Sequence, residues 1–118
     1  MKKGLFLSLI VFVTQSSFAN IENGKKIYKA YCAICHTVDN RASGSMGPDF
    51  NMVSYKRKKF EIMAYVRTPD VYYKEFGYSA NAMPSIDLTN QELEDVAEYI
   101  SSLQPFKKWM IKKKKIKD

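Results

Sequence analysis

Two cysteines and the only histidine of this 118-residue chain fall within five consecutive residues. The segment reads Cys-Ala-Ile-Cys-His, in which Cys32 and Cys35 are one helical turn apart and His36 follows directly. Residues three apart on a helix lie on the same face, so the two thiols are neighbours and the imidazole is beside them. One short peptide can therefore hold a group covalently and also supply a metal ligand.

This spacing is the attachment sequence of a c-type haem. Each thiol can form a thioether with one haem vinyl group, and the imidazole of His36 then lies under the iron as an axial ligand. We therefore expect one haem c, bound covalently through Cys32 and Cys35.

Two other chemistries use the same Cys-x-x-Cys pair. A disulfide or a thioredoxin-like redox pair suits an oxidising compartment, but it requires an alternating strand and helix pattern near the motif, which the sequence lacks. A zinc site requires further Cys or His ligands, and the chain has none outside this pentapeptide. Haem attachment is favoured over both.

The sixth iron ligand cannot be a second histidine of the same chain. It is a methionine, a weaker donor such as Lys or Asn, or nothing. Met83 is the best placed methionine, because small residues precede it, Pro84 follows it and the last expected helix begins soon after. Ligation by His36 and Met83 raises the reduction potential and fills both axial positions. The other methionines are close to His36 (Met46, Met52), in a helical stripe (Met63) or in a lysine-rich tail (Met110).

Residues 1–19 are typical of a signal peptide. Lys2 and Lys3 precede an apolar run over residues 5–13, and Ser17-Phe18-Ala19 has small residues at both positions of a cleavage site. An uncleaved membrane anchor is the rival interpretation, but a span needs about 20 apolar residues and this run is shorter. We expect cleavage after Ala19 and an exported, periplasmic location.

Residues 20–106 have helical periodicity and predict one all-α domain. A first helix capped by Asn20 delivers Cys32, and a last helix begins at a capping box of Thr89 and Glu92. We expect the inward stripes to be Gly24, Ile27, Tyr28 and Tyr31 in the first helix, and Leu93, Val96, Ala97, Ile100 and Leu103 in the last, opposite Glu94, Asp95, Glu98 and Ser101.

A middle helix is expected from Lys58 to Arg67, followed by a short helix. Thr68 caps the short helix, Pro69 suits its first position and Gly77 its exit. Phe60, Met63, Ala64 and Val66 are expected to point inward. Long loops are expected over residues 37–52 and 78–88.

The positive charge of the chain belongs to its end. Residues 107–118 contain seven lysines and one aspartate, whereas residues 20–106 contain ten Lys or Arg and eleven Asp or Glu. This tail can contact an acidic partner or an anionic membrane, and a solvated tail is the alternative. Lys56-Arg57-Lys58-Lys59 is interpreted as a solvated helix start. Nucleic-acid binding would explain neither haem attachment nor export.

Four motifs in order make residues 22–104 resemble the class I cytochrome c family. They are Gly24, Lys25 and Tyr28 ahead of the Cys-x-x-Cys-His motif, Gly47-Pro48-Asp49-Phe50, Met83-Pro84, and the last helix from Leu88 to Leu103. The resemblance implies the cytochrome c fold, with three to five helices wrapped around one haem. It also implies that Gly24 lets the first and last helices cross near Tyr99, and that the Pro48 carbonyl accepts a hydrogen bond from His36 Nδ1.

These observations predict an electron carrier rather than an enzyme. A haem with both axial positions filled would shuttle single electrons between respiratory redox proteins, such as membrane-bound oxidase or reductase complexes. One alternative is a haem subunit of a multi-subunit oxidoreductase of the sulfur-oxidising or terminal-oxidase type. The other, in which Met83 is displaceable, is a gas-binding or peroxidatic protein.

Overall fold

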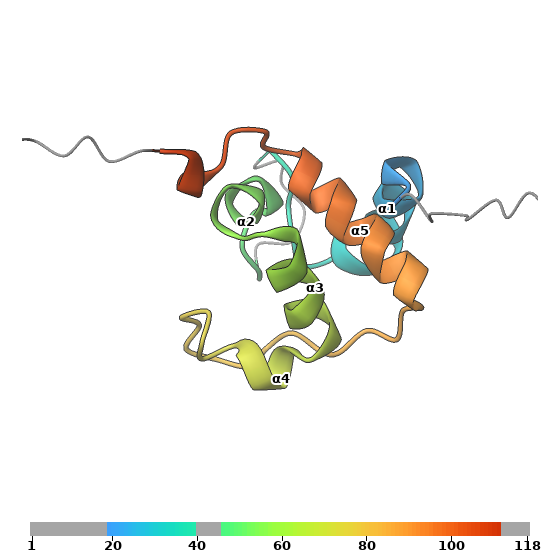
Figure 1. Cartoon of the computed structure of the whole chain (residues 1–118). Helices are drawn as coiled ribbons and strands as arrows, with labels where there is room; N and C mark the ends of the chain where they lie inside the picture. The colour runs from blue at the N-terminus through green and yellow to red at the C-terminus, as the bar shows by residue number, and fades with distance from the viewer. Residues whose placement is uncertain (1–18, 40–45, 112–118) are drawn as a thin grey trace, which may run out of the picture.

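The computed structural model describes residues 19–39 and 46–111, and this part of the chain is helical and contains no strand (Figure 1). The prediction of an all-α fold is confirmed. Most of the expected signal peptide and residues 112–118 of the lysine-rich tail lie outside the described residues. The elements are α1 (Ile21–Ile27), a π-helical turn η1 (Tyr28–Cys32), α2 (Phe50–Lys56), α3 (Lys59–Arg67), α4 (Pro69–Tyr72), α5 (Asn90–Ser102) and a 3₁₀ turn η2 (Lys108–Met110).

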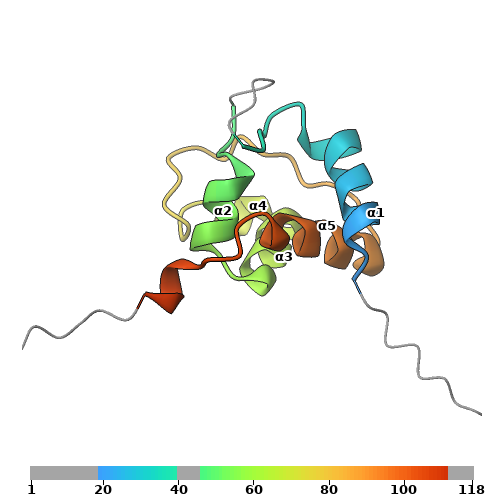
Figure 2. The same cartoon turned by 90° about the horizontal axis from the view of Figure 1, so that it is seen from above.

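Helices α1 and α5 cross in close contact, as both views show (Figures 1 and 2). Asn20 caps α1 through its side chain, which accepts the N–H of Asn23 at 3.1 Å. A Cβ atom added to Gly24 would collide with the carbonyl of Asp95 and lie 2.8 Å from Cβ of Tyr99. The absence of a side chain at Gly24 thus permits the crossing, as the resemblance implies.

Helix α5 has the predicted start and the predicted apolar stripe. Thr89 accepts the N–H of Glu92 at 3.1 Å, and the Glu92 carboxylate accepts the N–H of Thr89 at 2.9 Å. The stripe is buried at Leu93, Val96, Ala97 and Ile100, and Leu103 is partly buried. The prediction that Asp95 lies on the polar face is wrong, because Asp95 is only 2% exposed and its carboxylate binds the start of α1.

Two aromatic residues predicted to point inward do not. Tyr31 is half exposed because the chain widens into the π-helical η1, where Ala33 N–H bonds to Tyr28 O, and the extra residue rotates Tyr31 away from the stripe. Phe60 is 67% exposed. Val66 is buried as predicted, and Met63 packs against the core. The other residue that α3 buries is Ile62, four positions before Val66, and a residue two positions before Ile62 lies on the other side.

The expected loop over residues 37–52 ends earlier than predicted. Asp49 begins α2 by accepting the N–H of Asn51 at 2.9 Å, so Phe50 to Met52 are helical. Pro69 starts α4 and Thr68 is its N-cap residue, as predicted, but the Thr68 side chain makes no capping hydrogen bond, because its hydroxyl donates to the carbonyl of Ala64. Gly77, with φ of +89°, ends the following turn.

The second expected loop is confirmed: residues 78–88 contain no helix or strand. Figure 1 shows this segment passing α4 and running below α3 before the chain enters α5. None of the helices among the described residues is both long enough and apolar enough to cross a membrane.

Candidate haem site

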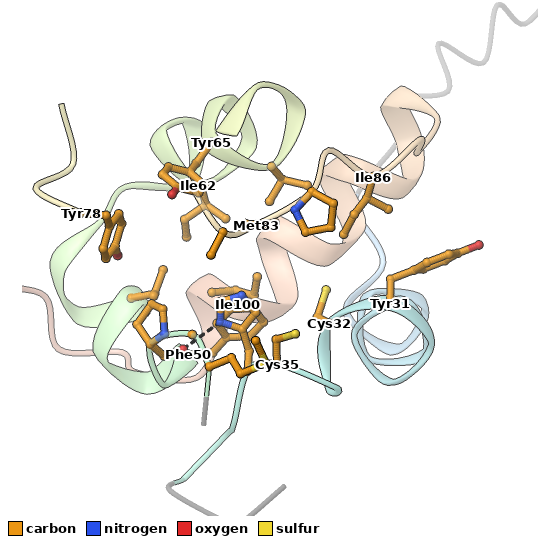
Figure 3. Close-up of a pocket in the computed structure, with 18 of the residues that line it drawn as sticks. Tyr31, Cys32, Cys35, Phe50, Ile62, Tyr65, Tyr78, Met83, Ile86 and Ile100 are labelled. Atoms are coloured by element: carbon orange, nitrogen blue, oxygen red, sulfur yellow. Dashed lines mark hydrogen bonds between the residues drawn. The ribbon is translucent and has the colours of Figure 1, made fainter. Parts of the chain in front are cut away.

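A cavity of about 670 Å³ lies between η1, α3, α5 and the loop over residues 78–87 (Figure 3). This volume is within the range of about 300–1,000 Å³ that cofactor pockets occupy. Its deep walls are apolar, formed by Phe50, Ile62, Val66, Val96 and Ile100. The site residues expected from the sequence all line this one cavity: Cys32, Cys35, His36, Pro48 and Met83.

The two cysteines lie on one tight turn that continues from η1. The N–H groups of Cys35 and His36 both donate to the carbonyl of Cys32, at 3.1 and 2.9 Å. Before haem attachment no disulfide joins the two cysteines, and burial raises the pKa of Cys32 to about 11. Its thiol is therefore protonated at neutral pH, whereas a thioredoxin-like nucleophile requires a lowered pKa.

The described residues contain no group of three or more His, Cys, Asp or Glu side chains that could hold a metal ion. The geometry of Cys32 and Cys35 instead presents two thiols at one edge of an apolar cavity, beside an imidazole.

His36 is held in one tautomer. Its Nδ1 lies 2.9 Å from the carbonyl oxygen of Pro48. A carbonyl can only accept, so Nδ1 carries the proton and the lone pair of Nε2 is free to bind a metal. Burial lowers the pKa of His36, and the Pro48 hydrogen bond offsets this only in part, so the neutral imidazole is favoured.

Two further contacts fix the imidazole, and a third fixes the backbone of His36. A Cβ atom on Gly47 would lie 2.6 Å from Nδ1, so the backbone packs directly on the ring. The Phe50 ring stacks on it with centroids 4.4 Å apart, and the hydroxyl of Tyr28 donates to the His36 carbonyl at 2.9 Å. Sequence reasoning assigned no such role to Gly47 or Phe50, although both stand in the Gly47-Pro48-Asp49-Phe50 element.

Met83 comes from the loop on the other side of the cavity. In Figure 3, Met83 and Ile62 approach the cavity from the side opposite to Cys35. Met83 is partly buried and packs against the core, and its loop neighbours Ala80, Ala82 and Pro84 also line the cavity. Small side chains here let the backbone approach a bound ring closely.

The other methionines are less suitably placed. Met46 also lines the cavity, but it is 79% exposed and adjoins Gly47, which packs on the His36 ring. Met63 packs against the core, whereas Met52 and Met110 are half exposed, and none of these three lines the cavity.

The donor set and the walls fit a haem c. Two thiols can take the vinyl groups, the neutral imidazole can bind the iron, and the apolar walls can enclose the porphyrin. Met83 presents a thioether from the opposite wall.

Comparison with known proteins agrees with this chemistry. The family model for cytochrome c matches residues 21–104. Cytochrome c6 of Pyropia yezoensis is 32% identical over 108 residues, covering 89% of this chain and 91% of that protein. Cytochrome c of Dictyostelium discoideum is 43% identical over 47 residues, covering 39% and 42% of the two chains.

A solved structure is similar as well. The c-type cytochrome SorU from Sinorhizobium meliloti superposes with a TM-score of 0.53 at 26% identity, covering 75% of this chain and 94% of that one. The expected cytochrome c fold and the single covalent haem are thereby confirmed. The chain belongs to the cytochrome c family, as a class I c-type cytochrome with one covalently bound haem c.

Proposed function

We propose that this protein is an exported electron carrier whose haem iron is bound by His36 and Met83. The observation that carries the proposal is that a thioether and a neutral imidazole line one apolar cavity, with Met83 opposite the cysteine turn. The bound haem supplies a one-electron ferric and ferrous couple.

The residues of this chain suit a carrier more than a catalyst. If His36 and Met83 both hold the iron, no ligand position would remain for a substrate. His36 is held by Pro48, Gly47 and Phe50, so its orientation changes little between oxidation states. The buried walls at Ile62 and Val96 exclude water from the site.

The ligand assignment is tested by the optical spectrum of haem-loaded protein. We expect the long-wavelength ferric band of methionine ligation in the wild type, and its loss in Met83→Ala. Met46→Ala and Met63→Ala are matched controls that should keep the band. Resistance of the pigment to acid-acetone extraction shows that haem attachment survives each change. A band that persists in Met83→Ala would disprove the assignment.

We infer that redox partners bind at the rim of the cavity, near the turn that carries Cys32 and Cys35. Tyr31, Ile34 and Met46 line the cavity and are exposed. An exposed apolar rim suits brief encounters of small area with an oxidase or reductase complex. Stopped-flow electron exchange with such a complex should slow in Met46→Ser at an unchanged reduction potential. An unchanged rate would place the contact elsewhere.

Export is tested by the mass of the protein recovered from the periplasm of a haem-maturing host. We expect a chain that begins at Asn20 and carries the mass of one haem. A product that retains the apolar run over residues 5–13 would favour the membrane-anchor interpretation instead.

A further inference from the structure

Two arginines hold the ends of the segment that carries Met83. This segment, residues 78–88 (the Met83 loop), connects the turn after α4 to α5. Arg57 precedes α3 and binds the chain just before the loop, whereas Arg67 ends α3 and binds the last residue of the loop. We propose that Arg57 and Arg67 are positioning residues for Met83. This role rests on the proposed function, in which Met83 binds the iron.

The middle of the Met83 loop has few contacts of its own. Residues 79–85 form no hydrogen bond with any residue that the structure describes. All of them are exposed except Met83, which is partly buried and packs against the core. Exposed segments with few contacts open at a low cost in free energy. The position of the Met83 thioether therefore depends on its own packing and on how the two ends of the loop are held.

Arg57 holds the first end. Its Nη2 donates to the carbonyl of Phe76 at 2.9 Å, and its guanidinium lies 4.2 Å from the centre of the Phe76 ring. Arg57 stands in the cluster interpreted from the sequence as a solvated helix start, but its side chain is only 27% exposed. One side chain thus makes a hydrogen bond and a cation–π contact with the same residue. The turn before the Met83 loop is thereby joined to the start of α3.

Arg67 holds the other end. Its Nη1 donates to the carbonyl of Leu88 at 3.1 Å, and its Nη2 donates to the side-chain oxygen of Asn90 at 2.6 Å. Leu88 is buried in the core, and Asn90 is the first residue of α5. The planar guanidinium binds both oxygens at once, in a geometry that a single ammonium group does not reproduce. Arg67 thus fixes the point at which the Met83 loop enters α5.

Helix α3 sets the separation of the two arginines. The helix packs on α5, and the ammonium of Lys59 joins the two helices by pairing with Glu94 and Glu98, at 3.2 and 3.1 Å. Both ends of the Met83 loop are therefore bound to one rigid frame, with Met83 on the cavity between them (Figure 3).

Loss of either arginine contact should let the Met83 loop open more often. An open loop would withdraw the thioether of Met83 and expose a ligand position of the iron. Hydrogen bonds from a charged group are about twice as strong as neutral ones, so each contact should contribute measurably to keeping the loop closed. In a carrier, this restraint would keep external ligands away from the iron.

Binding of imidazole to the ferric haem-loaded protein measures how often the Met83 loop opens, because imidazole binds the iron only where the thioether has left it. We expect Arg57→Gln and Arg67→Gln each to raise the binding rate about tenfold. Arg67→Lys should raise it less, since an ammonium retains one of the two hydrogen bonds. The control is Lys56→Gln, which removes the same charge at an exposed position and should keep the wild-type rate.

Amide hydrogen exchange provides a second measurement, which does not depend on iron ligation. The N–H groups of Tyr78 and Leu88 both form backbone hydrogen bonds, at 2.8 and 3.0 Å. Exchange at Tyr78 should be faster in Arg57→Gln, and exchange at Leu88 should be faster in Arg67→Gln. Unchanged imidazole binding together with unchanged exchange in both arginine variants would overturn the proposal.

General loss of stability is distinguished by Asp95→Asn. This variant weakens the contact between α1 and α5, away from the Met83 loop. It should lower the free energy of unfolding without raising the rate of imidazole binding. An increase equal to that of the arginine variants would overturn the proposal, because the rate would then follow overall stability.

Failure of the ligand assignment gives a different result. A wild type that lacks the methionine band and binds imidazole as fast as Met83→Ala would disprove ligation by Met83, and with it the role of the arginines at the iron. Faster exchange in Arg57→Gln and Arg67→Gln would then still support the two contacts that hold the Met83 loop.

Discussion

The backbone N–H of Asn20 donates to Oδ1 of Asp95 at 2.7 Å, which joins the start of α1 to the middle of α5. The side-chain amides of Asn23 and Gln91 donate to the same carboxylate, each at 2.8 Å. Burial by itself would raise the pKa of Asp95, but these three hydrogen bonds and the charge of Lys59 outweigh it. The folded-state pKa is therefore lower than the ordinary value.

Asp95→Asn should destabilise the fold by about 1–3 kcal/mol at pH 7, because a buried hydrogen-bonded charge is lost. The native pKa of Asp95 is depressed, so its contribution is complete above the unfolded-state value near pH 4 and declines as the pH falls through the lower native value. Urea unfolding of the haem-loaded protein at pH 7 and at pH 3 measures both effects. The difference in unfolding free energy between the wild type and Asp95→Asn should be smaller at pH 3 than at pH 7.

The exposed Glu75 provides the control for Asp95. Glu75→Gln removes one negative charge as well, but it should change stability by less than about 0.5 kcal/mol. Similar losses in the two variants would show that net charge, rather than the contact with α1, accounts for the effect.

Cleavage after Ala19, if it occurs as proposed, turns the Asn20 N–H into an α-ammonium group beside Asp95. The mature start would then add a charge-assisted bond to the crossing of α1 and α5. A protein that retains Ala19 should be less stable than one that begins at Asn20, by about 0.2–1 kcal/mol. The Asp95→Asn background should abolish this difference, and a difference that persists would exclude the ion pair.

Local signals made much of the fold predictable. The caps at Asn20 and Thr89 depend on residues three positions apart, and the α5 stripe follows helical periodicity. Burial of Asp95 could not be predicted in this way, because its partner Asn20 lies 75 positions away in the chain. The inner face of α3 was also ambiguous, since Phe60 and Ile62 are equally apolar choices and packing against α5 selects Ile62.

The haem-attachment part of the site could be predicted because its residues are adjacent in the sequence. The Cys32 to His36 motif is contiguous, and small residues flank Met83 in the sequence. The structure places all of these residues along the same cavity, and ligation by Met83 stays a prediction. Packing of Gly47 and Phe50 on His36 depends instead on how α2 begins at Asp49. That start lies inside the loop expected over residues 37–52, so these two contacts could not be predicted.

Gly24→Ala tests the helix crossing. The new Cβ atom would overlap the Asp95 carbonyl and approach Tyr99, so α1 and α5 must separate. Overpacking of this kind costs typically about 1–3 kcal/mol, and we expect a loss in the upper part of that range. Lys26→Ala, an exposed position on the same helix, is the control. Equal stability of Gly24→Ala and wild type by urea unfolding would contradict the close contact.

Lys107→Met tests how the chain beyond α5 is held against the fold. The Lys107 ammonium donates to the carbonyl and the hydroxyl of Ser54 and to the carbonyl of Ser101. The variant removes the ammonium that binds the carbonyl of the fully buried Ser54, whereas the Ser101 carbonyl keeps the hydrogen bond from the Ser54 hydroxyl. Unsatisfied buried polar groups cost about 1–3 kcal/mol, so thermal unfolding should occur at a lower temperature. The exposed neighbour in Lys108→Met should have little effect. Similar results for both variants would mean that the Lys107 contacts do not contribute.

Gly47→Ala tests the support of the iron ligand. A methyl group here would lie 2.6 Å from Nδ1 of His36, so the ring or the segment that carries Pro48 must move. Weakening the hydrogen bond to the Pro48 carbonyl makes the imidazole a poorer donor, which stabilises the ferric state less. The reduction potential should rise by about 40 mV for each 1 kcal/mol of ferric stabilisation lost.

Pro48→Ala is the matched control for Gly47→Ala, because it retains the backbone carbonyl that accepts from Nδ1. Redox titration of the haem-loaded proteins should show a larger shift for Gly47→Ala than for Pro48→Ala. An unshifted potential in Gly47→Ala would mean that the ring tolerates the extra methyl group, and that the orientation of His36 depends on Phe50 and the cysteine turn instead.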